Sequence, residues 1–168
     1  EVQGLAGKEV ALDLARRVAA LLPGARLTRQ GDETLPLEAR LALARTASVV
    51  VSLHMARGRE VRLYLPKDRT SPLAQSLPRL GDLPEERARL LRAYAGDPAR
   101  LALALEQALA AQGFAVVKAE GPYALTRVDG AAVLLEVGAE RLGTEEARAL
   151  VAQAIAQGIR AYLEGGAP

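Results

Sequence analysis

The 168-residue sequence contains no cysteine and no tryptophan, and only one histidine, one methionine and one phenylalanine. The lack of cysteine excludes a disulfide framework and any chemistry that depends on a thiolate. No apolar run is long enough to cross a bilayer, and we recognise no signal peptide, so the chain is expected to be cytosolic or already processed. The formal net charge of +2 predicts no strong global attraction to nucleic acid.

Half of the residues are hydrophobic, which at this length predicts one domain, residues 1–168, with a substantial core. Helical periodicity alternates with short apolar runs, and this pattern indicates an α/β domain in three layers, with helices flanking a mostly parallel sheet. The expected helices cover 8–22, 36–47, 98–112 and 145–163. Asp97 is the expected N-cap of the third helix, and Thr144 is that of the last. The expected strands cover 25–29, 48–53, 59–65, 114–118 and 131–135, with an extended segment at 123–127.

Residues 67–96 interrupt this alternation. The stretch is rich in proline and has no strand pattern, and we interpret it as an inserted surface segment because structureless loops of this length are uncommon in a compact domain. Its second half, 84–95, favours a charged helix. The arginines at 87–92 are interpreted as a solvated helix face, because the run is too short and too poor in aromatic residues to predict nucleic-acid binding.

Two of the expected strands end on an isolated polar residue. His54 follows the apolar run 48–53, and Glu136 follows 131–135. Ligands of open α/β sheets bind beyond the carboxyl ends of the strands, so we expect this imidazole and this carboxylate to meet at one edge of one sheet. The alternative is a structural role for each: a lone histidine is often structural, and a glutamate is often a salt-bridge partner.

Four stretches, in order, resemble the catalytic domain of the zinc-dependent N-acetylmuramoyl-L-alanine amidases, the peptidoglycan hydrolases of the Amidase_3 type. They are Gly4-Leu5 with Lys8-Glu9-Val10-Ala11-Leu12-Asp13-Leu14-Ala15, Leu27-Thr28-Arg29-Gln30-Gly31-Asp32 with Leu37-Glu38-Ala39-Arg40, Val51-Ser52-Leu53-His54, and Val133-Leu134-Leu135-Glu136-Val137-Gly138. Each motif alone is weak, whereas four motifs in the family's order and spacing are a strong signal.

The resemblance implies a reaction and a place for it. The family holds one Zn²⁺ with two histidines and a glutamate, and the metal activates water for attack on an amide. A second glutamate acts as general base and then protonates the leaving amine. By position, His54 matches a zinc histidine and Glu136 matches the catalytic glutamate. The implied activity is cleavage between N-acetylmuramic acid and L-alanine in peptidoglycan, in the periplasm or outside the cell.

The sequence also departs from the family pattern. The family's first strand and its Gly-His-Gly-Gly loop, which supplies the other zinc histidine, would lie upstream of Glu1. Gly7 occupies the place of the zinc glutamate, and Glu9 is about 200° further around the helix axis. His54 is therefore the only clear zinc ligand in this sequence. Three interpretations stay open: an amidase completed by further residues, an inactive amidase-like protein that binds peptidoglycan or regulates cell-wall enzymes, and a ligand-binding domain related only by ancestry.

Some members of the family carry an inserted helix that covers the zinc until a partner protein moves it. Residues 67–96 lie in a similar place, so the resemblance suggests an activator protein as a partner. Glu85 and Glu86 are the candidate occluding residues, and the alternative is that both lie on a solvated helix face.

Overall fold

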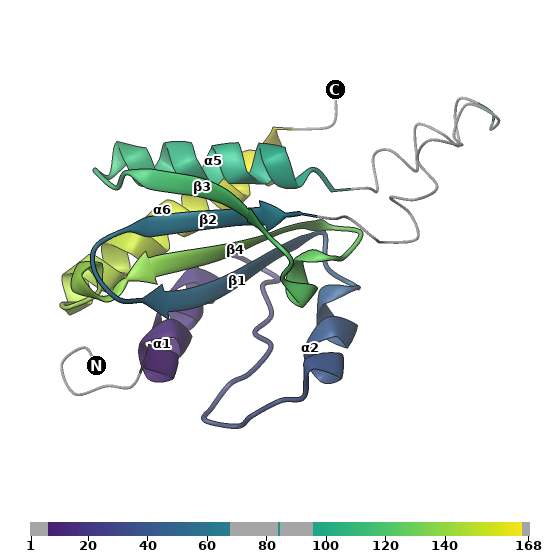
Figure 1. Ribbon diagram of the computed structural model, residues 1–168, viewed down its shortest axis with the longest axis horizontal. Coiled ribbons are helices and arrows are strands. Elements are labelled where there is room, and N and C mark those ends of the chain that lie inside the picture. The colour runs from purple at the N-terminus through teal and green to yellow at the C-terminus, as the bar shows by residue number, and fades with distance from the viewer. Residues whose placement is uncertain (1–6, 68–83, 85–95, 166–168) are drawn as a thin grey trace.

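The computed structural model describes residues 7–67, 84 and 96–165 (Figure 1). Most of the segment 67–96, with Glu85 and Glu86, therefore lies outside the described residues. The helices are α1 (Gly7–Leu21), α2 (Leu37–Ala44), α5 (Pro98–Ala111) and α6 (Glu145–Glu164), with short 3-10 helices η2 (Ala124–Thr126) and η3 (Ala139–Arg141). The strands are β1 (Val49–Ala56), β2 (Val61–Pro66), β3 (Val116–Gly121) and β4 (Ala131–Gly138).

The four strands form one sheet in the order β1-β4-β2-β3. β1 pairs with β4 and β2 pairs with β3 in parallel, whereas β2 and β4 are antiparallel. The expected parallel pairing is therefore found in two of the three strand pairs, and the sheet is mixed. The connection 57–60 is too short for a parallel crossover, and Gly58, with a φ of 85°, helps to reverse the chain there.

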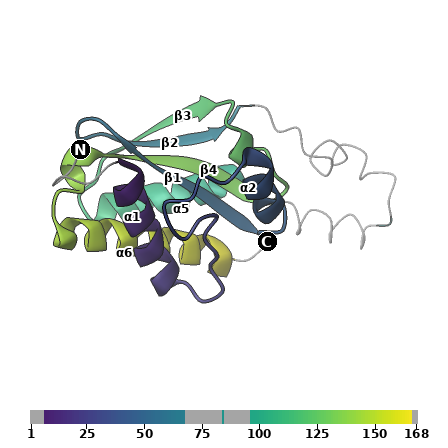
Figure 2. The same ribbon diagram turned by 90° about the horizontal axis from the view of Figure 1, so that it is seen from below.

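The core lies on one side of the sheet. Helices α1, α5 and α6 pack there, below β2 and β3 in the view of Figure 2. Alternate residues of β1 and β4 face these helices, among them Leu53 and Leu135, while Val50 and Ala132 face the other way. On that second face, α2 and η2 form a smaller cluster with Ala44 and Val128. The domain is thus an α/β structure whose second helical layer, among the described residues, is small.

The expected strand at 25–29 is wrong, because these residues are irregular and join no strand of the described sheet. The run has only two apolar residues, so it has little to bury. Side-chain hydrogen bonds hold it instead: Arg26 Nη2 donates to Thr46 Oγ1 at 2.9 Å, and Arg29 Nη1 donates to the Gly31 carbonyl at 2.9 Å. The segment expected to be extended at 123–127 forms η2, because the backbone and hydroxyl of Thr126 both donate to the Tyr123 carbonyl.

The other elements expected within the described residues are confirmed, with boundaries displaced by a few residues, whereas the helix expected at 84–95 lies outside those residues. Both predicted N-caps are present: Asp97 Oδ1 accepts from the Arg100 amide, and Thr144 Oγ1 accepts from the Ala147 amide, each at 3.1 Å. Each cap satisfies one of the backbone N–H groups that the first turn of a helix leaves unpaired.

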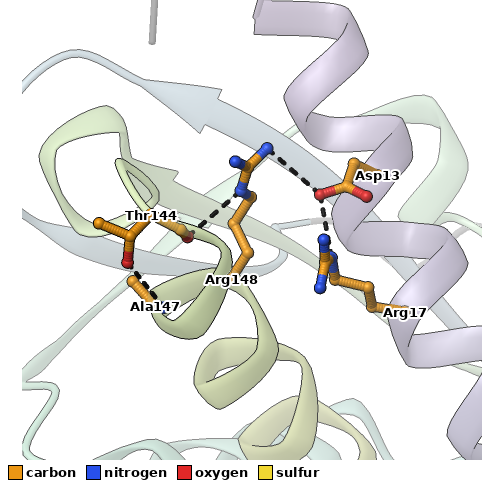
Figure 3. A network of polar contacts seen from close by, with 5 residues as sticks. All are labelled: Asp13, Arg17, Thr144, Ala147 and Arg148. Carbon is orange, nitrogen blue, oxygen red and sulfur yellow. Dashed lines mark hydrogen bonds and ion pairs between the residues drawn. The ribbon is translucent and has the colours of Figure 1, made fainter. Parts of the chain in front are cut away.

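A buried arginine links α1 to α6 (Figure 3). The Arg148 side chain is only 6 % exposed, its Nη1 lies 3.4 Å from Asp13 Oδ2, and its Nε donates to the Thr144 carbonyl at 3.3 Å. Arg17, which lies nearer the helix surface, donates from Nε to the same Asp13 oxygen at a distance of 3.0 Å. Asp13 therefore joins a buried cation on α6 to a more exposed one on its own helix.

We expect Asp13→Ala to lower the free energy of unfolding by about 2 kcal/mol, because it removes a charged acceptor from a buried guanidinium. The matched control is Arg17→Ala, which breaks only an i,i+4 surface pair and is expected to cost about 0.5 kcal/mol or less. Urea denaturation of both variants measures the difference. Equal effects of the two substitutions would contradict the role given to Arg148.

Candidate functional site

His54 and Glu136 are direct neighbours in the sheet. The parallel register of β1 and β4 pairs them one to one, two residues before the end of each strand. Adjacent strands lie about 4.8 Å apart, and paired residues point to the same face. The expectation that the two residues come together near the carboxyl ends of their strands is therefore confirmed. His54 is exposed and Glu136 is half-buried.

The face that carries this pair is rich in polar groups. Besides Glu136 on β4, this face carries Ser52 and His54 on β1 and Arg62 and Tyr64 on β2. These four residues are register partners of Leu134 or Glu136. We call this set of five residues the polar face. It is the face opposite to α1, α5 and α6. Ser52 Oγ and His54 Nε2 share a hydrogen bond at 3.1 Å, which ties the imidazole to its own strand.

Two tyrosines flank Glu136. Tyr64 Oη donates to Glu136 Oε2 at 3.3 Å, and the ring of Tyr123 meets that of Tyr64 edge to face, with centroids 5.2 Å apart. Loss of hydration raises the pKa of the Tyr123 hydroxyl, and the nearby Tyr64 and Glu136 raise it further. The Tyr123 hydroxyl therefore stays protonated near neutral pH. The hydrogen bond from Tyr64 orients the Glu136 carboxyl group.

Arg62 lies opposite Glu136 on β2. Its Nε donates to Glu60 Oε2 at 2.7 Å, and Nη2 lies 2.5 Å from the same oxygen. Hydrogen bonding to Tyr64, and then to Glu60, raises the pKa of the Arg62 guanidinium. A permanently positive side chain on β2 is therefore the register partner of the candidate catalytic carboxylate on β4.

Tyr64, Tyr123 and Arg62 are site residues that were not predicted from the sequence. A signal was available for the first and last, because the alternation in 59–65 places Arg62 and Tyr64 on the same outward face, and the whole chain has only four tyrosines. Tyr123 carried no such signal. Its position depends on the turn at η2, which brings a loop residue back over β2.

The described residues do not fit a complete zinc site. Gly7 begins α1 beside the end of β1, where an added Cβ would lie 2.9 Å from Met55 Cε, and it has no side chain to offer a metal. Within residues 7–67, 84 and 96–165, no group of three His, Cys, Asp or Glu side chains could hold a metal ion. Catalytic zinc normally takes three protein ligands. The roles predicted for His54 as a metal ligand and for Glu136 as the catalytic residue stay predictions.

The arrangement of strands and helices is that of the amidase catalytic domains. The catalytic domain of the N-acetylmuramoyl-L-alanine amidase CwlV from Bacillus (Paenibacillus) polymyxa var. colistinus superimposes with a TM-score of 0.71 at 23% identity, over 96% of this chain and 87% of that one. The N-acetylmuramyl-L-alanine amidase Ami1 from Mycobacterium smegmatis gives 0.72 at 18% identity, over 96% and 79%.

A third similar structure is the CwlD amidase from Clostridioides difficile, solved in complex with the GerS lipoprotein. Its TM-score is 0.65 at 18% identity, over 97% of this chain and 89% of that one. No protein-family profile and no curated protein matches the sequence. At these identities the likeness establishes the fold, in agreement with the expected resemblance. None of the helices in the described part of the chain has the length and apolar character needed to span a membrane.

The charge of Glu136 should be detectable through Tyr123. We expect Tyr123 to ionise above the usual pH for tyrosine and Glu136→Gln to lower its pKa, because a neutral amide no longer disfavours the phenolate. Titration of labelled tyrosine ring carbons by NMR, with Tyr123→Phe to assign the signal, measures the shift. Glu164→Gln is the control and should leave the Tyr123 titration unchanged. An unaltered curve in Glu136→Gln would contradict the proximity of the two groups.

Proposed function

We propose that this domain hydrolyses the amide bond between N-acetylmuramic acid and L-alanine in peptidoglycan. The observation that carries the proposal is the one-to-one pairing of His54 with Glu136 at the carboxyl ends of parallel strands, on the face away from the core helices. The amidase fold supports it, because the same fold in the similar structures belongs to enzymes named for this reaction. Such a substrate would place the protein in the periplasm or outside the cell.

Glu136 is the residue suited to proton transfer in this reaction. Its carboxylate takes a proton from the attacking water, whose oxygen bonds to the amide carbon, and the same proton then passes to the L-alanine nitrogen as the C–N bond breaks. Tyr64 donates to one carboxylate oxygen and fixes its direction, which leaves the other oxygen for water. The exposed His54 imidazole lies on the neighbouring strand beside Glu136, and it is the one imidazole of the chain.

Zinc in this site would need ligands in addition to the described residues. His54 is the one described residue that matches a zinc ligand of the family, and Gly7 cannot supply the carboxylate. This observation favours a second candidate function, in which the domain binds peptidoglycan or regulates cell-wall enzymes without hydrolysis. A protein partner is compatible with both functions, and the CwlD amidase was solved with such a partner.

Hydrolysis is tested by incubating the protein with purified peptidoglycan and measuring released stem peptide by mass spectrometry. We expect release by the wild-type protein and a loss of about 100-fold or more in Glu136→Gln, because general acid–base catalysis contributes about 10²–10⁴-fold. The matched control is Glu164→Gln, an exposed carboxylate at the far end of α6. Full activity of Glu136→Gln would refute the role of this residue.

Metal content and sedimentation separate the two candidates. An enzyme of the amidase type should carry about one Zn²⁺ per chain when purified without chelator, and His54→Ala should lower that content. A wild-type protein that releases no peptide and holds no zinc, yet sediments with peptidoglycan, would establish the binding function in place of hydrolysis.

A further inference from the structure

A hollow of about 570 Å³ opens beside the carboxyl end of β1, next to the polar face. It is formed by the end of β1, the reversing turn and the start of β2. Its lining residues are Ala56, Arg57, Gly58, Arg59, Glu60 and Arg62. We call this feature the basic hollow. It adjoins the candidate catalytic residue, because Arg62 pairs directly with Glu136 across the sheet.

The basic hollow carries more positive than negative charge. Three arginines and one glutamate line it, and Arg59 and Arg62 are held by ion pairs, with Glu140 at 3.4 Å and with Glu60 at 2.5 Å. Arg57 is exposed and has no hydrogen-bond or ion-pair partner among the described residues. Two guanidinium groups are therefore positioned by carboxylates, and a third is available to a ligand.

We propose that the basic hollow binds carboxylate groups of the peptide stem of peptidoglycan. This inference rests on the proposed function, because it places the scissile amide at Glu136. The arginine fork matches a carboxylate with two parallel hydrogen bonds, and such charge-assisted pairs are stronger than neutral ones. The stem peptide begins at the nitrogen of the scissile amide and carries free carboxylates, so its charge complements the hollow.

The opposite flank of Glu136 has a different chemistry. Tyr64 and Tyr123 lie toward the start of β4, since Tyr64 pairs with Leu134, whereas the basic hollow lies toward its end. The two halves of the substrate also differ, because one is a sugar and the other an acidic peptide. The basic flank is the one that matches the peptide, and this assigns a direction to the substrate along β4.

Binding of a synthetic stem tetrapeptide tests the assignment without requiring hydrolysis. The probes are the peptide with free carboxylates and the same peptide with every carboxylate amidated, measured by calorimetry at low ionic strength with the full chain. We expect Arg57→Gln to weaken binding of the acidic peptide roughly three- to tenfold and to leave the amidated peptide unaffected. The control is Arg45→Gln, an exposed arginine at the end of α2, at the opposite end of β1.

A second variant gives a change that misfolding cannot imitate. Glu60 forms an ion pair with the Arg62 guanidinium. Glu60→Gln removes that charge and should raise the affinity for the acidic peptide by about two- to threefold, because Arg62 becomes available to the peptide. Added salt should reduce the binding of the acidic peptide in every variant, because the groups are exposed and screened.

The outcomes separate this inference from the proposed function. Equal binding of the acidic and amidated peptides would overturn the basic hollow as a peptide site, even if hydrolysis is observed. Displacement of the acidic peptide by an equal concentration of inorganic phosphate would show a general anion site and would also overturn it. Carboxylate-dependent binding that is lost in Arg57→Gln supports the inference, even if no hydrolysis is found.

Discussion

The in-register parallel pairing of β1 with β4 is the constraint on which the site depends. β4 is buried along its whole length except at Glu136, and its alternate residues Val133, Leu135 and Val137 lie in the core beneath the helices. A shift of one residue would turn His54 toward those helices and an apolar neighbour toward solvent. Each large core side chain that lost its burial would cost about 1.5–3 kcal/mol. The core therefore fixes the side of the sheet on which the imidazole and the carboxylate appear.

The uneven covering of the sheet explains how polar groups can gather beside a buried strand. Helices α1, α5 and α6 pack on one face, while α2 and η2 cover only the region around Val50 and Ala132 on the other. Toward the carboxyl ends of β1 and β4, polar side chains keep access to water and need not find every partner within the protein. A carboxylate at Glu136, a hydroxyl at Tyr64 and a guanidinium at Arg62 are consistent with that position.

Much of the sheet could be predicted from local pattern, and its pairings could not. The apolar runs at 48–53 and 131–135 identified the two strands that carry His54 and Glu136, because both strands place apolar residues against the packed clusters on the two faces of the sheet. β2 runs antiparallel to β4 because the short turn at 57–60 reverses the chain after β1. In addition, β4 lies between β1 and β2, which are consecutive in sequence. The irregular path of 25–29 and the return of Tyr123 over Tyr64 depend on contacts between distant segments, which periodicity does not report.

Neither Glu136 nor Gly7 is explained by core packing. A half-buried carboxylate in an otherwise buried strand loses part of its hydration, and the hydrogen bond from Tyr64 partly replaces it. Packing of the core therefore does not by itself account for a carboxylate at this position. Gly7 is not required by packing either, because the atom that a Cβ would approach is the mobile end of Met55. A shift of the Met55 side chain would thus accommodate a Cβ at this position, so crowding at the Cβ does not by itself explain the glycine.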